Sequence, residues 1–243
     1  PNHNVVSLKQ LKHENGTISS NPRVMREIAT RYYSNLLSIV SFSNEDLTSR
    51  SCVWNKLNPR ITQDMNVRLQ DILTYDELSE ALQALPKNCC PDVDGLTPTF
   101  FIKYWDVFKA YLCTTFQQIL REGNMPSQFI EGLIYLIPKS DGPSLDIKKW
   151  RPITLLNTVY KILAKAISIR LSTIMPTVIH SAQTRFIRER GILDNVYTFW
   201  ESVALATKSN QKLAIVMLDF EKAYDRVDWE FLQGVLACFG FLK

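Results

Sequence analysis

The stretch LAIVMLDFEKAYDRVDWEFL, residues 213–232, joins an unbroken apolar run to a charged segment that carries four aromatic residues. A short continuous apolar run is typical of a strand buried on both faces. Such a strand ends at a sheet edge where side chains emerge into a crevice, and Asp219 stands there. A carboxylate in that place costs free energy unless it finds a partner, and a divalent cation is a strong one. Asp219 is therefore expected either to bind a metal ion or to cap the next helix, and its position alone does not separate the two.

The composition argues against a membrane-spanning, secreted, zinc-binding or disulfide-stabilised protein. The 243 residues are 46% hydrophobic, which suffices for one large domain or two small ones. No apolar run approaches the roughly eighteen residues of a membrane span, and the N-terminus has no apolar segment of the signal-peptide kind. The five cysteines form no CxxC pair, which argues against a zinc site or a disulfide framework. We therefore expect an intracellular protein, cytoplasmic or nuclear, that is not secreted and binds no membrane.

Positive charge gathers in one block of the chain. Residues 131–190 hold 10 Lys and Arg against 4 Asp and Glu, whereas residues 1–130 hold 13 of each and residues 191–243 hold 5 against 7. A basic block followed by an acidic one suits an enzyme that handles phosphates. A solvated basic surface explains the same charges.

The first part of the chain is expected to be mainly helical. Apolar residues recur at helical spacing in its first helix, and Thr74 with Glu77 matches a capping box. Gly123 is expected to stop the last of these helices. The helices are predicted over residues 22–37, 74–85, 97–108 and 109–122. Turn formers or weak periodicity predict linkers and loops at residues 1–20, 40–72 and 86–95.

From about residue 130 the pattern mixes strands with helices. GLIYLIP (132–138) and WRPITL (150–155) read as the two strands of a hairpin, which Asp141-Gly142 can close. Pro152 would confine its strand to an edge or a bulge. A third strand is predicted over residues 213–218. Helices are predicted over residues 157–174, 192–206 and 229–241, the first with Tyr160, Leu163, Ala164, Ile167 and Leu171 on one face. Helices first and strands mixed with helices later indicate an α+β fold.

The segment LDFEKAYDRVDWEFL resembles the first palm motif of reverse transcriptases, in particular those of LINE-type (non-LTR) retrotransposons. Upstream, the blocks IPK, WRPITLLN, YKILAK, QTRF and ILDN follow in the family's order within residues 133–195. Residues 73–105 resemble the segment that precedes the polymerase core, so the resemblance covers roughly residues 70–243. Group II intron maturases are the nearest enzymatic alternative, but residues 73–105 and the palm motif LDFEKAYDRV are more similar to the LINE-type proteins.

The resemblance implies a partial right-hand polymerase. Residues 1–70 would be a linker and helix, residues 71–130 a helical N-terminal extension, and residues 131–243 the fingers with the first palm strand. The complete enzyme would copy an RNA template from a DNA primer, using deoxynucleotide triphosphates and Mg²⁺.

In the palm, the resemblance makes Asp219 the first metal-binding aspartate and the backbone carbonyl of Phe220 a further ligand. Tyr224 would be the aromatic gate that closes off space for a 2′-hydroxyl, although a core aromatic is the ordinary alternative. Asp225 and Asp228 are expected to be surface or capping residues and not metal ligands.

In the fingers, the resemblance assigns Arg151 to the incoming triphosphate, which a guanidinium can hold bidentately, and Lys139 to a second phosphate contact. Three cations on the predicted helix, Lys161, Lys165 and Arg170, would touch the template or primer backbone. A solvated helix face explains these three nearly as well.

Two features depart from the family pattern. The family usually has glycine where this chain has Asp92, Arg185 and Glu189, and glycine serves where the backbone needs a positive φ or a close approach. The chain also lacks an initiator Met and any Asp-Asp pair. We therefore expect a truncated fragment of the polymerase that is inactive alone. The alternatives are a non-catalytic RNA-binding module and the product of a decayed gene.

Overall fold

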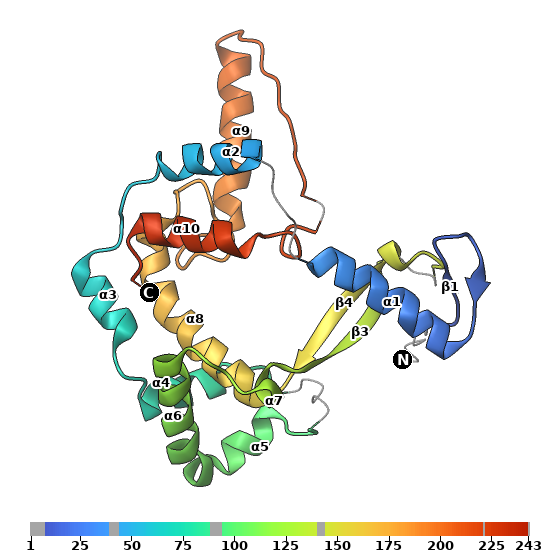
Figure 1. The fold of residues 1–243 in the computed structure, drawn as a ribbon. Helices are drawn as coiled ribbons and strands as arrows, with labels where there is room; N and C mark the ends of the chain where they lie inside the picture. Colours follow the sequence, from blue (N-terminus) through green and yellow to red (C-terminus); the bar gives the residue numbers. More distant parts are fainter. Residues whose placement is uncertain (1–7, 39–43, 88–93, 140–143, 221, 243) are drawn as a thin grey trace. The chain divides into compact units, whose positions relative to one another are not determined.

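The computed structural model describes residues 8–38, 44–87, 94–139, 144–220 and 222–242 (Figure 1). The chain divides into two units that interleave along the sequence. The first takes residues 1–39 and 72–166, and the second takes residues 40–71 and 167–243. Helices and small sheets are mixed, as an α+β chain requires. The predicted division into residues 1–70, 71–130 and 131–243 stays a prediction.

The first unit begins with a short hairpin that the sequence did not predict. Strand β1 (Leu11–Lys12) pairs antiparallel with β2 (Ile18–Ser19), and Gly16 between them has a φ of 89°. Helix α1 (Pro22–Leu37) follows over the predicted residues. Its start is fixed locally, because the Asn21 side chain accepts a hydrogen bond from the Arg23 amide and proline suits the first turn.

The predicted long hairpin is confirmed. Strand β3 (Gly132–Pro138) pairs antiparallel with β4 (Trp150–Leu156), in a register that runs from Gly132 opposite Leu156 to Pro138 opposite Trp150. Among the described residues β4 pairs only with β3, so Pro152 lies on an edge strand, as predicted. The 3-10 turn η1 (Ile147–Lys149) leads into β4. The predicted Asp141-Gly142 turn lies outside the described residues.

The N-terminal hairpin, α1 and the long hairpin share one small core. It consists of Leu11, Ile28, Tyr33 and Ile147, all buried, with Leu136 of β3 packed against it. The backbone joins the same segments, because the Lys12 amide donates to the Leu145 carbonyl oxygen at 2.8 Å. Residues 8–37 are therefore part of the same packed structure as the β3–β4 hairpin.

The rest of the first unit is helical. Helix α4 (Tyr75–Gln83) begins with the predicted capping box: Thr74 Oγ1 accepts from the Glu77 amide, and the Glu77 carboxylate accepts from the Thr74 amide at 2.9 Å. Helices α5 (Pro98–Lys103), α6 (Trp105–Glu122) and α7 (Ser127–Ile130) follow. The break between α5 and α6 falls at Tyr104, some residues earlier than predicted. Gly123 ends α6 in the left-handed conformation, as predicted.

Helix α8 (Thr158–Val178) is longer than predicted and buries a different stripe. Asn157 caps it by accepting from the Tyr160 amide at 2.7 Å. Ala164, predicted on the same face as Leu163, is exposed. The buried residues of the helix are Thr158, Ile162, Leu163, Ala166, Ile174 and Val178. Residues 158–166 belong to the first unit and residues 167–178 to the second.

The second unit holds two helices that the sequence did not predict, α2 (Asn44–Trp54) and α3 (Gln63–Gln70). It also holds the predicted α9 (Ile192–Lys208) and α10 (Trp229–Phe239). Its core groups Ile61, Ile174 and Val178 with partly buried neighbours that include Phe239.

The predicted strand over residues 213–218 is not formed. Residues 211–220 are extended and exposed, and no described segment pairs with them. A strand exists only as one member of a hydrogen-bonded pair, so an apolar run without a neighbour stays single. Most of the apolar side chains of α9 are exposed as well, Trp200 by 62%.

Candidate functional site

Asp219 and Phe220 lie at the end of this extended segment. Both side chains are exposed, Phe220 by 81%. Tyr224, in the turn that follows, is also 81% exposed, so in this chain it is not the core aromatic that the alternative interpretation required. The three predicted palm residues thus lie close along the chain and present their side chains to solvent.

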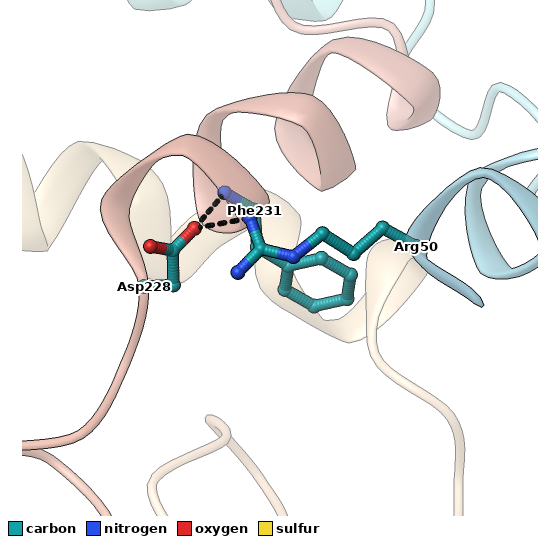
Figure 2. Close-up of polar contacts among 3 residues, drawn as sticks. All are labelled: Arg50, Asp228 and Phe231. Carbon is teal, nitrogen blue, oxygen red and sulfur yellow. Dashed lines mark hydrogen bonds and ion pairs between the residues drawn. The ribbon is translucent and has the colours of Figure 1, made fainter. Parts of the chain in front are cut away.

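The far end of this loop is fixed by Asp228, which begins α10. Its Oδ1 accepts from the Phe231 amide at 2.7 Å and from Nη1 of Arg50 in α2 at 2.8 Å (Figure 2). The Phe231 amide, and with it the Arg50 guanidinium, holds the pKa of the Asp228 carboxyl below its ordinary value. The prediction that Asp228 is a capping residue is confirmed, because its side chain accepts a hydrogen bond in the first turn of α10.

Aromatic packing continues the contact between α2 and α10. The Trp54 and Phe231 rings stack with centroids 6.1 Å apart, and the Arg50 guanidinium lies 5.7 Å from the centre of the Phe231 ring. Gly234, one turn further along α10, leaves room for the Trp54 indole. The sequence did not single out Arg50 or Trp54, because their partners lie more than 170 residues away.

The C-terminal end of α10 is held by the segment that leads into α3. The Arg60 and Ile61 amides donate to the Phe239 carbonyl oxygen at 2.9 and 3.0 Å. Buried Asn66 donates from Nδ2 to the Gly240 carbonyl oxygen at 2.8 Å. Residues 50–66 therefore hold both ends of the helix that follows the Asp219 loop.

The two predicted phosphate contacts of the fingers belong to the first unit. Arg151 is exposed on β4, opposite Ile137. Lys139 directly follows β3, is exposed, and donates its amide to the Lys149 carbonyl oxygen at 2.9 Å. The β3–β4 pairing brings these two cations to the same end of the hairpin.

The three predicted cations of α8 differ in their surroundings. Lys161 and Lys165 are half-buried in the first unit. Arg170, in the second unit, donates from Nη1 to the carbonyl oxygens of Leu69 at 3.2 Å and Asp71 at 2.6 Å. These bonds favour a structural role for Arg170, in which it ties α8 to the end of α3.

A second arginine that the sequence did not single out organises the loop after α8. Arg190 donates from Nη2 to the Pro176 and Ile179 carbonyl oxygens, at 3.0 and 3.1 Å, and thereby satisfies the end of the helix. From Nη1 it donates to the carbonyl oxygens of His180 at 2.7 Å and Gln183 at 2.9 Å. The Arg190 side chain thus donates hydrogen bonds to four backbone carbonyl oxygens.

The departures from glycine have different consequences in this loop. Glu189 has a φ of 65°, in the left-handed region that favours glycine. Arg185 has no positive φ, but its neighbour Phe186 does, at 64°. The expected strain is therefore present at Glu189 and absent at Arg185, while Asp92 lies outside the described residues.

Among the described residues, no group of three or more His, Cys, Asp or Glu side chains is arranged to hold a metal ion. Asp219 offers one exposed carboxylate, and Phe220 a backbone carbonyl beside it. Mg²⁺ in phosphate-handling sites commonly uses one or two carboxylates together with substrate phosphates. The residues therefore fit part of such a site, with further ligands needed from elsewhere. None of the helices in the described part of the chain has the length and apolarity to cross a membrane.

Comparison with known families gives a match over residues 137–243, to the family described as reverse transcriptase (RNA-dependent DNA polymerase). The matched region contains the β4 strand with Arg151, helix α8, and the loop with Asp219 and Tyr224.

Relatives extend the similarity beyond that region. The chain is 36% identical over 230 residues, 94% of its length, to the "Transposon TX1 uncharacterized 149 kDa protein" of Xenopus laevis. It is 25% identical over 157 residues, 64% of its length, to the "Probable RNA-directed DNA polymerase from transposon BS" of Drosophila melanogaster. It is 26% identical over 159 residues, 65% of its length, to the "RNA-directed DNA polymerase from mobile element jockey" of Drosophila funebris. The aligned part covers 17% of each of these proteins. The resemblance identified from the sequence is confirmed.

Proposed function

We propose that this chain, whose residues 137–243 belong to the reverse transcriptase family, supplies the fingers and the start of the palm of an RNA-directed DNA polymerase of a non-LTR retrotransposon. The observation that carries the proposal is the family match over a region in which Asp219 ends an apolar run and Arg151 stands exposed on the hairpin. The partners of the whole polymerase would be an RNA template, a DNA primer and deoxynucleotide triphosphates.

In the palm part, Asp219 would hold a divalent ion, Mg²⁺, with help from the Phe220 carbonyl. When bound, such ions stabilise the charge on the attacking and leaving oxygens of a phosphoryl transfer. The exposed Tyr224 ring would lie against the sugar of the incoming nucleotide and exclude a 2′-hydroxyl. The proposal is supported by the exposure of all three side chains on one short loop.

In the fingers part, Arg151 and Lys139 would bind the triphosphate. A guanidinium forms two parallel hydrogen bonds to phosphate oxygens, and an ammonium adds a point charge. Their exposure and their place at one end of the hairpin support this assignment. Lys161 and Lys165 would contact the backbone of template or primer, whereas Arg170 would support α8 through its carbonyl contacts.

The test uses the parent polymerase that contains these residues, on a primed RNA template with deoxynucleotides. We expect Asp219→Asn to reduce incorporation by roughly a thousandfold or more, since a metal ligand contributes several kcal/mol to transition-state stabilisation. Arg151→Gln should raise the KM for the nucleotide, and Tyr224→Ala should admit ribonucleotides. Asp225→Asn is the matched control and should retain activity. Full activity of the Asp219→Asn enzyme would refute the proposal.

The 243-residue chain by itself is expected to be inactive, because it contains no Asp-Asp pair to complete a two-ion site. Primer extension by the purified chain that is lost on Asp219→Ala would contradict this expectation. RNA binding that is unchanged by magnesium, together with a parent protein that never incorporates nucleotides, would favour the non-catalytic alternative.

A further inference from the structure

Three segments bring four lysines to one end of the β3–β4 hairpin. The Lys12 amide of β1 donates to the Leu145 carbonyl oxygen at 2.8 Å, two residues before the start of η1, which contains Lys148 and Lys149. The Lys139 amide at the end of β3 donates to the Lys149 carbonyl oxygen at 2.9 Å. We call Lys12, Lys139, Lys148 and Lys149 the lysine rim. Lys12 comes from outside the region that matches the reverse transcriptase family.

The packing directs the rim lysines toward solvent. Leu11 and Ile147 are buried in the shared core, and Lys12 and Lys148, their neighbours along the chain, are exposed. Lys139 and Lys149 are exposed as well. None of the four forms an ion pair with another described residue. Their charges are therefore available to a partner.

The charges of the described residues around the rim do not neutralise it. The described residues of 8–37 and 132–156 hold nine Lys and Arg against three Asp and Glu, and all twelve are exposed. One of the three acids, Asp146, is committed locally, since its side chain accepts from the Lys148 amide at 2.9 Å. Concentrated positive charge of this kind favours a polyanion as partner.

One face of the hairpin adds a feature that favours a single-stranded nucleic acid. Tyr135 is 58% exposed and pairs across the hairpin with Ile153, two residues from Arg151 on the same strand. Because side chains alternate along a strand, Tyr135 and Arg151 lie on the same face. An exposed ring beside cations is the combination with which proteins bind single strands, since bases stack on the ring and phosphates contact the cations.

We propose that Lys12, Lys148 and Lys149 of the lysine rim bind the phosphate backbone of single-stranded RNA, while Lys139 remains the triphosphate contact proposed above. Lys12 makes the N-terminal segment, residues 8–37, part of this RNA-binding surface. The proposal rests on the proposed function insofar as it takes the polyanion to be RNA. It goes beyond that function in assigning an RNA contact to residues that precede the family match.

The test measures binding of the full 243-residue chain to a fluorescent, unstructured 20-nucleotide RNA by anisotropy, in EDTA and without nucleotides, between 50 and 300 mM KCl. In these conditions the metal site takes no part, so the result is independent of Asp219 and of polymerase activity. Each phosphate contact contributes about 0.7 to the slope of log Kd against log salt concentration. Lys12→Gln/Lys148→Gln/Lys149→Gln should therefore lower the slope by about 2 and weaken binding at least tenfold at about 150 mM salt.

A control with the same charge change is available at three exposed lysines outside the rim. Lys56→Gln/Lys87→Gln/Lys208→Gln should bind RNA as the unmodified chain does. The single variant Lys12→Gln should lower the slope by about 0.7. Equal slopes for the rim and control variants would overturn the proposal, and so would an unmodified chain that binds no RNA. An unchanged slope for Lys12→Gln would remove the N-terminal segment from the surface. A double-stranded DNA of equal length that binds as tightly would overturn the assignment to single strands.

Discussion

Gly234 in α10 provides the sharpest test of how the second unit is held together. A Cβ atom at this position would lie 2.6 Å from Cζ2 and 2.7 Å from Cε2 of Trp54. Carbon atoms in real structures do not approach so closely, so either the indole or the helix has to move. Moving the indole would cost free energy, because it would disrupt the stacking of Trp54 on Phe231.

Two opposing effects decide the result of Gly234→Ala. Alanine inside a helix is favoured over glycine by about 1 kcal/mol. Overpacking a well-filled contact costs typically about 1–3 kcal/mol. We expect the second effect to prevail and the variant to lose about 1 kcal/mol of unfolding free energy, or roughly 2–4 °C in Tm for a chain of this size. In a Trp54→Leu background the ring is gone, so the same substitution should stabilise by up to about 1 kcal/mol.

The assay is urea unfolding followed by circular dichroism for the four members of this double-mutant cycle. Hydrogen exchange of the α10 amides, residues 229–239, reports on the second unit separately from the first. The reversal of sign between the two backgrounds is the decisive result. If Gly234→Ala stabilises the chain with Trp54 present as much as without it, the contact between α2 and α10 is not formed in solution.

Three further predictions concern single side chains. Glu189→Gly should stabilise the chain by about 1 kcal/mol by relieving a left-handed residue, whereas Arg185→Gly should not stabilise it; thermal unfolding of both variants checks this. The pKa of Asp228 is lower in the folded chain than in the unfolded chain, where it is about 4. Asp228 therefore stabilises the fold above about pH 4, and this stabilisation is lost as the pH falls through the folded pKa. Asp228→Asn should accordingly make the Tm fall less steeply as the pH is lowered in this range. Burial raises the pKa of the Cys113 thiol, so iodoacetamide at pH 8 should modify it more slowly than exposed Cys52, as peptide mass spectrometry would show.

Elements with local signals could be predicted from the sequence. The capping box at Thr74, the proline at the start of α1 and the glycine after α6 each mark a helix end within a few residues of the chain. The β3–β4 hairpin was predictable for the same reason, since its strands are apolar runs separated by a short polar segment.

Elements held by distant partners could not be predicted in this way. Helices α2 and α3 have weak periodicity, and their positions depend on pairs such as Arg50 with Asp228 and Asn66 with Gly240, which are more than 170 residues apart. The strand predicted over residues 213–218 was wrong for a different reason. The apolar run is a good strand sequence, but strand formation requires a neighbouring strand, and no described segment provides one.

The candidate site shows the same division between local and distant determinants. Among the described residues, the loop after Asp219 is fixed at its C-terminal end, where Asp228 holds the start of α10 through the Phe231 amide and Arg50. The residues before Asp219 form neither helix nor strand and are exposed. The sequence places Asp219 at the end of an apolar run, and its chemical setting depends on what pairs with that run. Since Arg50 acts from a segment that precedes the family match, that segment contributes to the geometry of the loop although it carries none of the predicted site residues.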